Sequence, residues 1–544
     1  MPFLPSALRR AVVTATVLAV AGGGLVVSSP TAGATTLPAS VQRISGPTRL
    51  ATAIAASQDQ FTTAGGAKAA VLTRADNYPD ALAGVPLAAR VGGPLLLTAS
   101  KSLDPTVRAE LVRVLPAAAT VYILGGTAAV STAVQTTITG LGFTVQRIAG
   151  SDRFATAVAV ANALGQPTTI FEATGLNFPD ALAGGPAAIN LGGAILLTNG
   201  TAQAPATAAY LAAHTGGARY ALGGPAALAD PAAIAIAGTD RYATAARVAA
   251  TFFATPTSVG VATGTNFPDA LAAGPDLASK SAPLLLVPPT GALPAGTAAE
   301  LLRFSGTLRT ALVFGGVASV SDDVAAAAGQ LANLGATAAA QSASAAFAGR
   351  YGVLGTHVQT AAGSANTTQV FDGTAGTSTF YTEHAGSTTT PGTPTRADFV
   401  AFPVNDSGAL EHAVNTAFAS VYAQEHYSST DPHAQFLVNA EQVVINPLAS
   451  ATLRLAVLIA LAELPNTTVQ PGARDSGGHV GLGISGPISG NTALNGDIIS
   501  YIFDPATGLL LEDNIVTPGG TQIASSSITT FTTLAAPPPD PYPS

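Results

Sequence analysis

The chain repeats one six-residue stretch three times, as Tyr78-Pro79-Asp80-Ala81-Leu82-Ala83, Phe178-Pro179-Asp180-Ala181-Leu182-Ala183 and Phe267-Pro268-Asp269-Ala270-Leu271-Ala272. Before each stretch stands an arginine that opens an Ala-Thr-Ala segment, and after it come an aliphatic run and a glycine pair. The arginines are Arg49, Arg153 and Arg241, and the glycine pairs are Gly125-Gly126, Gly223-Gly224 and Gly315-Gly316. Self-similarity at a spacing of roughly 90 to 100 residues predicts a repeat architecture.

Within one unit, short aliphatic runs alternate with Ala-rich segments of helical length. In the first copy the runs are bounded by Gly or Pro and predict buried strands at 69–73, 94–98 and 120–124. Helices are predicted between them at 51–57, 79–91 and 105–115. Because strands that alternate with helices imply parallel pairing with right-handed crossovers, we expect each unit to be a small α/β layer structure.

The first 34 residues have the pattern of a secretory signal peptide. Arg9 and Arg10 precede an apolar stretch at 11–27, and Ala32-Gly33-Ala34 is a small-residue cleavage pattern. A membrane anchor is the alternative, since the apolar stretch is just long enough to span a bilayer. The glycines at 22–24 and the cleavage pattern favour a removed signal. We therefore expect an exported mature chain with no membrane span.

Composition separates the chain into two halves. It has no cysteine, so an exported form contains no disulfide and must be stabilised by burial. Residues 35–328 carry 16 Lys plus Arg against 15 Asp plus Glu, whereas residues 329–544 carry 4 against 15. The two halves must have different surfaces. Nothing resembles the basic stripe that neutralises a phosphate backbone, which argues against nucleic acid as a partner.

The aspartates and the glycine pairs each permit two interpretations. Asp80, Asp180 and Asp269 follow a proline, and this order favours a helix start, where a carboxylate complements the helix dipole. A ligand-binding role is the alternative. The glycine pairs close apolar strands and favour tight turns. Such turns also expose backbone N–H groups that can cradle an anion.

The repeat arginines are harder to explain by local structure alone. Arg49, Arg153 and Arg241 stand at helix starts in a region with few charges. A planar guanidinium there suits a carboxylate, a phosphate or the aspartate of its own repeat. Asp152 and Asp240 directly precede the arginine in two copies, whereas the first copy has Thr48, so an adjacent carboxylate is not required in every copy.

At these motifs the chain resembles the cell-wall-binding repeat type 2 family of Gram-positive surface proteins, over about residues 41–328. The resemblance implies three tandem Toprim-like α/β repeats, packed as a pseudo-threefold module with ligand grooves between them. It also implies non-covalent attachment to an anionic cell-wall polysaccharide. Carried over position by position, it makes six residues the best ligand-binding candidates: Arg49, Arg153, Arg241, Asp80, Asp180 and Asp269.

The C-terminal half has a different character. From about Ala326 the chain is rich in Ala, Gly, Ser and Thr, which is typical of a linker. The segments that follow predict an α+β domain, and its 503–510 segment resembles part of a domain of uncharacterised actinobacterial exported proteins, which implies no activity. The expected elements are strands at 369–371 and 379–382, helices at 409–422 and 448–464, and a hairpin of 497–503 and 509–516.

The predicted organisation follows from these observations. It comprises a signal peptide at 1–34, repeat 1 at 35–144, repeat 2 at 145–236, repeat 3 at 237–328, a linker at 329–365, an acidic α+β domain at 366–535 and a Pro-rich tail at 536–544.

Signs of catalysis are weak in the C-terminal half. Glu425, His426, Asp431 and His433 are four potential metal ligands, but Pro432 interrupts them and no helical His-Glu-x-x-His pattern is present, which favours a solvated loop. The sequence has no Gly-x-Ser-x-Gly elbow and no thiol nucleophile. The 481–486 segment spells a dinucleotide fingerprint but lacks the helix that should follow it. We predict no catalytic residue, metal or other cofactor.

The sequence thus predicts a secreted, non-enzymatic surface protein, held on an anionic wall polysaccharide by its repeats and displaying an acidic domain. A cell-wall hydrolase or hydrolase modifier, targeted by the same repeats, is the rival hypothesis. A third is that the repeats bind a soluble sugar or protein. The sequence leaves the oligomeric state open.

Overall fold

A computed structural model describes residues 40–344 and, in segments, 351–534. Its gaps lie at 361–362, 373–376, 383–385, 392–401, 404–406, 426–430, 446–448, 450, 477, 489–495, 505–509 and 518–521. The predicted signal peptide and Pro-rich tail lie outside the described residues. Over the described ranges, no helix has the length and apolar character needed to cross a membrane.

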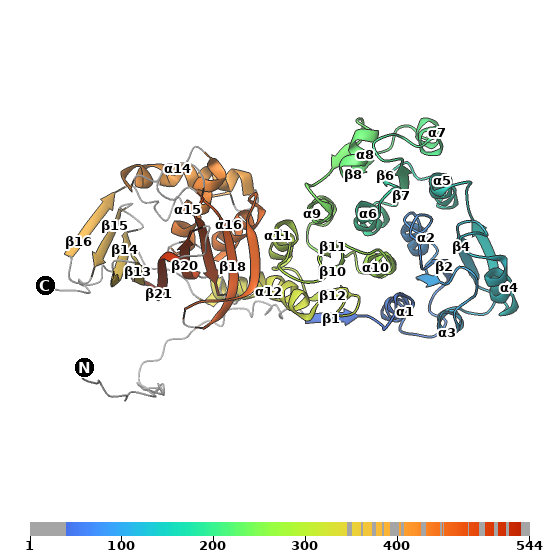
Figure 1. The fold of residues 1–544 in the computed structure, drawn as a ribbon, viewed down its shortest axis with the longest axis horizontal. Coiled ribbons are helices and arrows are strands. Elements are labelled where there is room, and N and C mark those ends of the chain that lie inside the picture. The colour runs from blue at the N-terminus through green and yellow to red at the C-terminus, as the bar shows by residue number, and fades with distance from the viewer. Residues whose placement is uncertain are drawn as a thin grey trace, which may run out of the picture. The chain divides into compact units, whose positions relative to one another are not determined.

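Three four-stranded parallel sheets form the repeat module, residues 40–314 (Figure 1). In spatial order the first sheet is β3 (Leu95–Thr98), β2 (Ala69–Arg74), β4 (Thr120–Leu124) and β5 (Thr144–Ile148). The second is β7 (Ala194–Thr198), β6 (Ile170–Thr174), β8 (Arg219–Leu222) and β9 (Ile234–Ile236). The third is β11 (Leu284–Val287), β10 (Ser258–Thr263), β12 (Thr310–Phe314) and β1 (Ser40–Ile44). The predicted α/β class with parallel strands is confirmed.

The strand that opens each repeat belongs to the sheet of another repeat. β5 opens repeat 2 but pairs with β4 of repeat 1. β9 is the equivalent strand of repeat 3, which therefore begins slightly before the predicted residue 237, and it pairs with β8 of repeat 2. β1 opens repeat 1 and pairs with β12 of repeat 3, from Ser40 opposite Thr310 to Ile44 opposite Phe314. The exchange therefore runs in a cycle, in which the first strand of the module ties repeat 1 to repeat 3.

Helices follow the strands in a regular order. After the opening strands come α1 (Arg49–Gln60), α5 (Arg153–Ala163) and α9 (Arg241–Phe252). After the central strands come α2 (Gly84–Arg90), α6 (Pro179–Asn190) and α10 (Pro268–Ser279). The others are α3 (Pro105–Val114), α4 (Thr132–Gly140), α7 (Pro205–Ala213), α8 (Gly224–Ala229), α11 (Ala295–Phe304) and α12 (Asp322–Ser344). The helix predicted at 79–91 begins only at Gly84, because the residues before it form turns.

The helices α2, α6 and α10 contact one another, so one helix from each repeat meets the other two. One equivalent position of each repeat, five residues after the repeat aspartate, lies in this contact. It is Val85 in repeat 1, Gly185 in repeat 2 and Gly274 in repeat 3. A Cβ added at Gly185 would lie 2.9 Å from Val85 Cγ1, and one added at Gly274 would lie closer still. One valine therefore fills the space that two glycines leave, which explains a difference between the copies.

The C-terminal domain, residues 351–534, is built on an antiparallel sheet, in the α+β manner that was predicted. The sheet contains, in spatial order, β16 (Gly386–Pro391), β15 (Thr377–Thr382), β14 (Gly363–Asp372), β13 (Tyr351–Thr360), β21 (Gln522–Leu534), β20 (Leu510–Val516), β19 (Ile498–Phe503), β18 (Val480–Pro487) and β17 (Thr468–Arg474). Its helices are α14 (Ser407–Glu425), α15 (Pro432–Val444) and α16 (Ala451–Glu463). The buried Tyr501 hydroxyl on β19 donates to Leu437 O on α15 at 2.7 Å, which fixes a helix to the sheet.

The linker predicted at 329–365 is wrong. The helix α12 runs through 329–344, and β13 and the start of β14 occupy much of the remainder. The small residues at the start of this segment are mostly alanines, which are the strongest helix formers. Val324, Ala328 and Leu331 of α12 are buried, so the Ala-rich composition reflects close helix packing rather than a flexible chain.

We predict that Gly274→Ala destabilises the repeat module by about 1–3 kcal/mol, because the new methyl group overpacks the contact with Val85. Thermal unfolding of the full chain measures the effect. Gly140→Ala in α4 is the matched control, since nothing lies within 4 Å of a Cβ at that position. Adding Val85→Ala to Gly274→Ala should recover part of the loss, and losses that simply add would contradict this packing.

Candidate binding sites between the repeats

Each repeat arginine is the first residue of its helix and reaches the loop that follows the central strand of its own sheet. Arg49, Arg153 and Arg241 open α1, α5 and α9. Their Nη1 atoms donate to Ala75 O at 2.7 Å, Gly175 O at 2.6 Å and Gly264 O at 2.6 Å. Those carbonyls stand just beyond β2, β6 and β10. The three guanidinium groups are thus held at the carboxyl ends of the sheets.

The residue before each arginine caps the helix. The side chains of Asp152 and Asp240 accept from the backbone N–H groups of Ala155 and Ala243, each at 2.8 Å. Thr48 accepts from the N–H of Ala51 at 3.2 Å in the first copy. Threonine and aspartate are both good helix N-caps. This explains why the first copy can lack the aspartate that precedes the arginine in the other two.

Each repeat aspartate lies against the first glycine of its repeat. A Cβ added at Gly125 would lie 2.5 Å from Asp80 Oδ2, and one at Gly315 would lie 2.6 Å from Asp269 Oδ2. Gly223 stands in the same way against Asp180. These glycines have φ angles of 92°, 108° and 80°, so they are required both for the turn and for the space.

The predicted turns are therefore confirmed, and the anion cradle is not supported at the first glycines. Their N–H groups donate to the last carbonyl of the exchanged strands, as Gly125 does to Ile148 O at 2.9 Å. The helix-start interpretation holds for Asp180 and Asp269, which lie in the first turns of α6 and α10. Asp80 instead lies in the turns before α2.

These residues meet at the topological switch point of each sheet. In the first sheet β2 and β4 are neighbours, and the connection from β2 runs to β3 on one side whereas that from β4 runs to β5 on the other. Asp80 follows β2 and Gly125 follows β4. Open parallel sheets bind ligands in the crevice outside the carboxyl ends of such strands. The second and third sheets have the same strand order around β6 and β10.

Two of the arginines, Arg49 and Arg241, also face the preceding repeat. The guanidinium carbon of Arg241 lies 5.9 Å from the ring centroid of Phe178, and that of Arg49 lies 5.7 Å from the ring centroid of Phe267. These separations suit a cation–π interaction. The sequence suggested a pair with the aspartate of the same repeat, whereas Arg241 of repeat 3 acts on Asp180 of repeat 2.

The environment of Asp180 is electrostatically distinctive. Burial raises the pKa of Asp180 to about 6, while the Arg241 charge and a hydrogen bond with Thr244 act in the opposite direction. Both opposing groups belong to α9, which starts repeat 3. One candidate site is therefore assembled from an aspartate and an aromatic ring of one repeat and the helix start of the next.

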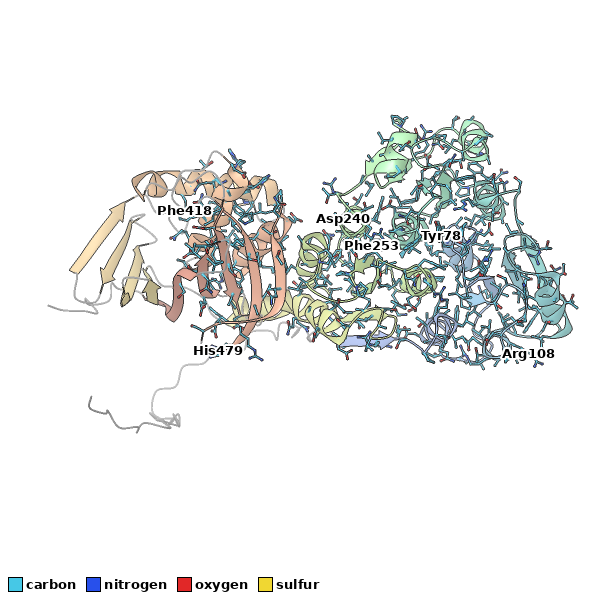
Figure 2. The ribbon with its side chains drawn as sticks, in the orientation of Figure 1. Tyr78, Arg108, Asp240, Phe253, Phe418 and His479 are labelled. Atoms are coloured by element: carbon cyan, nitrogen blue, oxygen red, sulfur yellow. The ribbon has the colours of Figure 1, made fainter. Side chains whose placement is uncertain are left out.

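Three aromatic rings, one from each repeat, join the candidate sites. Tyr78 lies 5.4 Å from Phe178 and 5.7 Å from Phe267 between ring centroids, and the two phenylalanines lie 6.1 Å apart. The Tyr78 hydroxyl donates to Leu176 O of repeat 2 at 2.9 Å. Figure 2 labels Tyr78 inside the repeat module and Arg108 on its outer part. Sequence reasoning missed this convergence, although each copy has an aromatic residue before its Pro-Asp pair.

The first copy differs from the others beside its site. Arg74 donates to Asp76 through Nε at 2.7 Å and Nη2 at 2.8 Å, which lowers the pKa of Asp76 to about 2. The equivalent residues in the other copies are Thr174 and Thr263. Each threonine hydroxyl accepts a hydrogen bond, at 3.2 Å, from the backbone N–H group of the residue two positions later. This ion pair is not apparent from the repeated motifs.

The C-terminal candidates for metal binding do not form a site in the described residues. Asp431 caps α15 and His433 lies in its exposed first turn, so the predicted solvated loop ends before residue 431, and residues 426–430 lie outside the described residues. His433 Nδ1 lies 3.0 Å from Glu411 Oε1 of α14. His426 is outside the described residues. In the part of the chain that is described, no three His, Cys, Asp or Glu side chains are grouped to hold a metal ion.

The chain matches the family model described as Cell wall binding domain 2 (CWB2) at residues 43–135, 147–232 and 235–325. It is 32% identical over 308 residues to the N-acetylmuramoyl-L-alanine amidase LytC of Bacillus subtilis, which covers 56% of this chain and 60% of that protein. It is 31% identical over 156 residues to the Amidase enhancer of the same species, which covers 29% of this chain and 21% of that protein. The chain thus spans less than two thirds of each relative.

Among solved structures, Cwp8 from Clostridium difficile is similar with a TM-score of 0.50 and 27% identity, over 54% of this chain and 52% of that one. The three matched family segments coincide with the three repeats whose sheets exchange strands. The chain therefore belongs, through three tandem copies within residues 43–325, to the cell wall binding domain 2 family, and it is a cell-wall-associated surface protein.

Proposed function

We propose that the three sites between the repeats hold the protein non-covalently on an anionic cell-wall polysaccharide. One observation carries the proposal. Across the described residues, each of Arg49, Arg153 and Arg241 makes a single hydrogen bond, to a backbone carbonyl, and no ion pair. The guanidinium group is oriented by this bond, and its remaining N–H groups are free to bind the carboxylate or phosphate of a ligand.

The three kinds of residue have complementary roles in this proposal. The arginines supply the charge that attracts the polymer, and the aromatic rings beneath two of them supply apolar faces for sugar rings. Asp180 acts on Arg241, and Asp80, Asp180 and Asp269 accept hydrogen bonds from sugar hydroxyls in this proposal. Because residues 35–328 are nearly neutral, recognition rests on these placed groups rather than on a general positive field.

The cyclic strand exchange supports the finer architectural inference. We infer that the repeats are Toprim-like units related by a pseudo-threefold axis, with Tyr78, Phe178 and Phe267 near that axis. Such a module presents three related sites on one polymer, and the effective local concentration of the second and third sites strengthens attachment. The signal peptide and the outward display of the acidic domain belong to the same proposal.

Removal of two arginines tests the proposal directly. We expect the full chain to be pulled down by Gram-positive cell walls, and Arg153→Ala, Arg241→Ala to weaken this binding by about tenfold or more, since each charged hydrogen bond contributes roughly 1.5–3 kcal/mol. Arg108→Ala, on the exposed face of α3, is the matched control and should bind normally. Walls stripped of phosphodiester-linked polymers by hydrofluoric acid should no longer bind the protein. Equal binding to stripped walls would point to peptidoglycan instead.

The relation to an amidase supports a second candidate function, a wall hydrolase or hydrolase modifier. Under the anchoring proposal, we expect the purified chain to produce no clearing zone in a gel that contains cell walls. A clearing zone that disappears in His433→Ala, while wall attachment persists, would instead establish the hydrolase. The same gel with an added amidase tests for a modifier, which would intensify that amidase's zone.

A further inference from the structure

Repeat 2 contains a buried polar network in place of apolar residues. Glu172 in β6 is fully buried, and Gln203 Nε2 donates to its Oε2 atom. Arg219 in β8 lies with Nη1 3.0 Å from Oδ2 of Asp230, which follows α8. The matching positions in repeats 1 and 3 are Leu72 and Val261 for Glu172, Leu103 and Leu293 for Gln203, and Val121 and Ala311 for Arg219.

Burial makes this replacement costly unless the network is neutral and hydrogen-bonded. Within the described residues, Glu172 Oε1, Gln203 Oε1 and Asp230 Oδ2 are buried without a hydrogen-bond donor, although Arg219 stands at ion-pair distance from Asp230. The network has two carboxyl groups and one guanidinium group. If both carboxyl groups were ionised, one negative charge would remain uncompensated beside a fully buried strand.

A single proton removes the net charge and satisfies two of the three oxygens, and leaves Gln203 Oε1 as the one oxygen of this described set without a donor. A proton on Glu172 makes the set neutral, because one carboxylate then faces one guanidinium. The proton also lets Glu172 Oε1 donate a hydrogen bond to Asp230. Asp230 is close enough to affect the pKa of Glu172 through a side-chain hydrogen bond and through its charge. Burial is the main effect that raises the pKa of Glu172 to about 7, with Asp230 acting in the same direction.

We propose that Glu172 and Asp230 share one proton, and that its loss loosens β6 and β8 of repeat 2. This inference goes beyond wall binding and does not depend on it. Among the described residues, Asp230 and Arg219 are the charged groups that face Glu172. The folded state favours protonated Glu172. Protonation therefore contributes fully to the stability of the fold below the ordinary pKa of glutamate, and this contribution is lost as pH rises through about 7.

Loosening of repeat 2 would reach two of the three candidate sites. The strand β6 carries Glu172 and leads directly into the segment with Phe178 and Asp180, which faces Arg241 of repeat 3. Arg153 is held by Gly175 O at the end of the same strand. The proton would thus control how firmly both junctions of repeat 2 are ordered.

Hydrogen exchange of the full chain, measured by mass spectrometry at about pH 5.5 and about pH 8.5, tests the inference locally. Protection factors correct for the intrinsic pH dependence of exchange. We expect protection of β6 and β8 to fall by about tenfold more than that of β2 and β4 of repeat 1 between the two pH values. This readout requires no ligand, so its outcome is independent of whether the protein binds walls.

Two variants identify the responsible group. Glu172→Gln keeps the shape of the side chain, supplies N–H donors and cannot titrate, so the extra pH response of repeat 2 should disappear. Glu172→Leu with Gln203→Leu reproduces the apolar pair of repeat 1 and should abolish the response in the same way. A response that persists in both variants, or an equal response in all three repeats of the wild type, would overturn the proposal. Restoration of protection at the higher pH by millimolar calcium or magnesium would also overturn it, because the three oxygens would then hold a cation.

Discussion

The parallel pairing of β1 with β12 is the contact on which the repeat module depends. It brings residues 40–44 beside 310–314 and supplies the third sheet with its edge strand. An ion cluster reinforces the same junction: Lys280, directly after α10, pairs with Asp276 of that helix, and its Nζ lies 2.9 Å from Asp59 Oδ2 of α1. With this junction made, every repeat has a neighbour on both sides. Arg49 and Arg241 then face a ring of the repeat before them, and Arg241 also acts on the carboxylate of Asp180.

This arrangement explains why single repeats are poor candidates for independent binding units. An isolated copy would hold its arginine against its own loop carbonyl but would lack the ring that lies beneath it. The first strand of each copy would also have no sheet of its own to join. The requirement for neighbours is a general property of repeat proteins. Here it applies to the candidate site as well as to the core, because residues such as Arg241 and Asp180 come from different repeats.

Much of the fold could be predicted from local sequence patterns. Short aliphatic runs such as Leu95–Thr98 and the helix that starts at Pro105 lie close to where they were expected, because periodicity and capping are local signals. The exchange of β1 into the third sheet could not be predicted in this way, since strand partners are set by contacts distant in sequence. The supposed linker failed for a related reason: alanine-rich composition fits a tightly packed helix as well as a loose chain.

The candidate site shows the same division between local and non-local information. The repeated positions identified Arg241 and Asp180 as candidates. They did not reveal that these two residues meet across a boundary between repeats. The trio of Tyr78, Phe178 and Phe267 was visible as three equivalent positions, although their contact required the structure. The network at Glu172 escaped notice because only an alignment of the copies, combined with burial, reveals a polar group where the others are apolar.

The most direct test of the account is hydrogen exchange of the full chain with and without wall polysaccharide released from cell walls. The account predicts added protection at the segments around 74–80, 174–180 and 263–269, together with the starts of α1, α5 and α9. Protection confined to the outer helices α3 and α7, or to the C-terminal domain, would contradict a binding site assembled between the repeats.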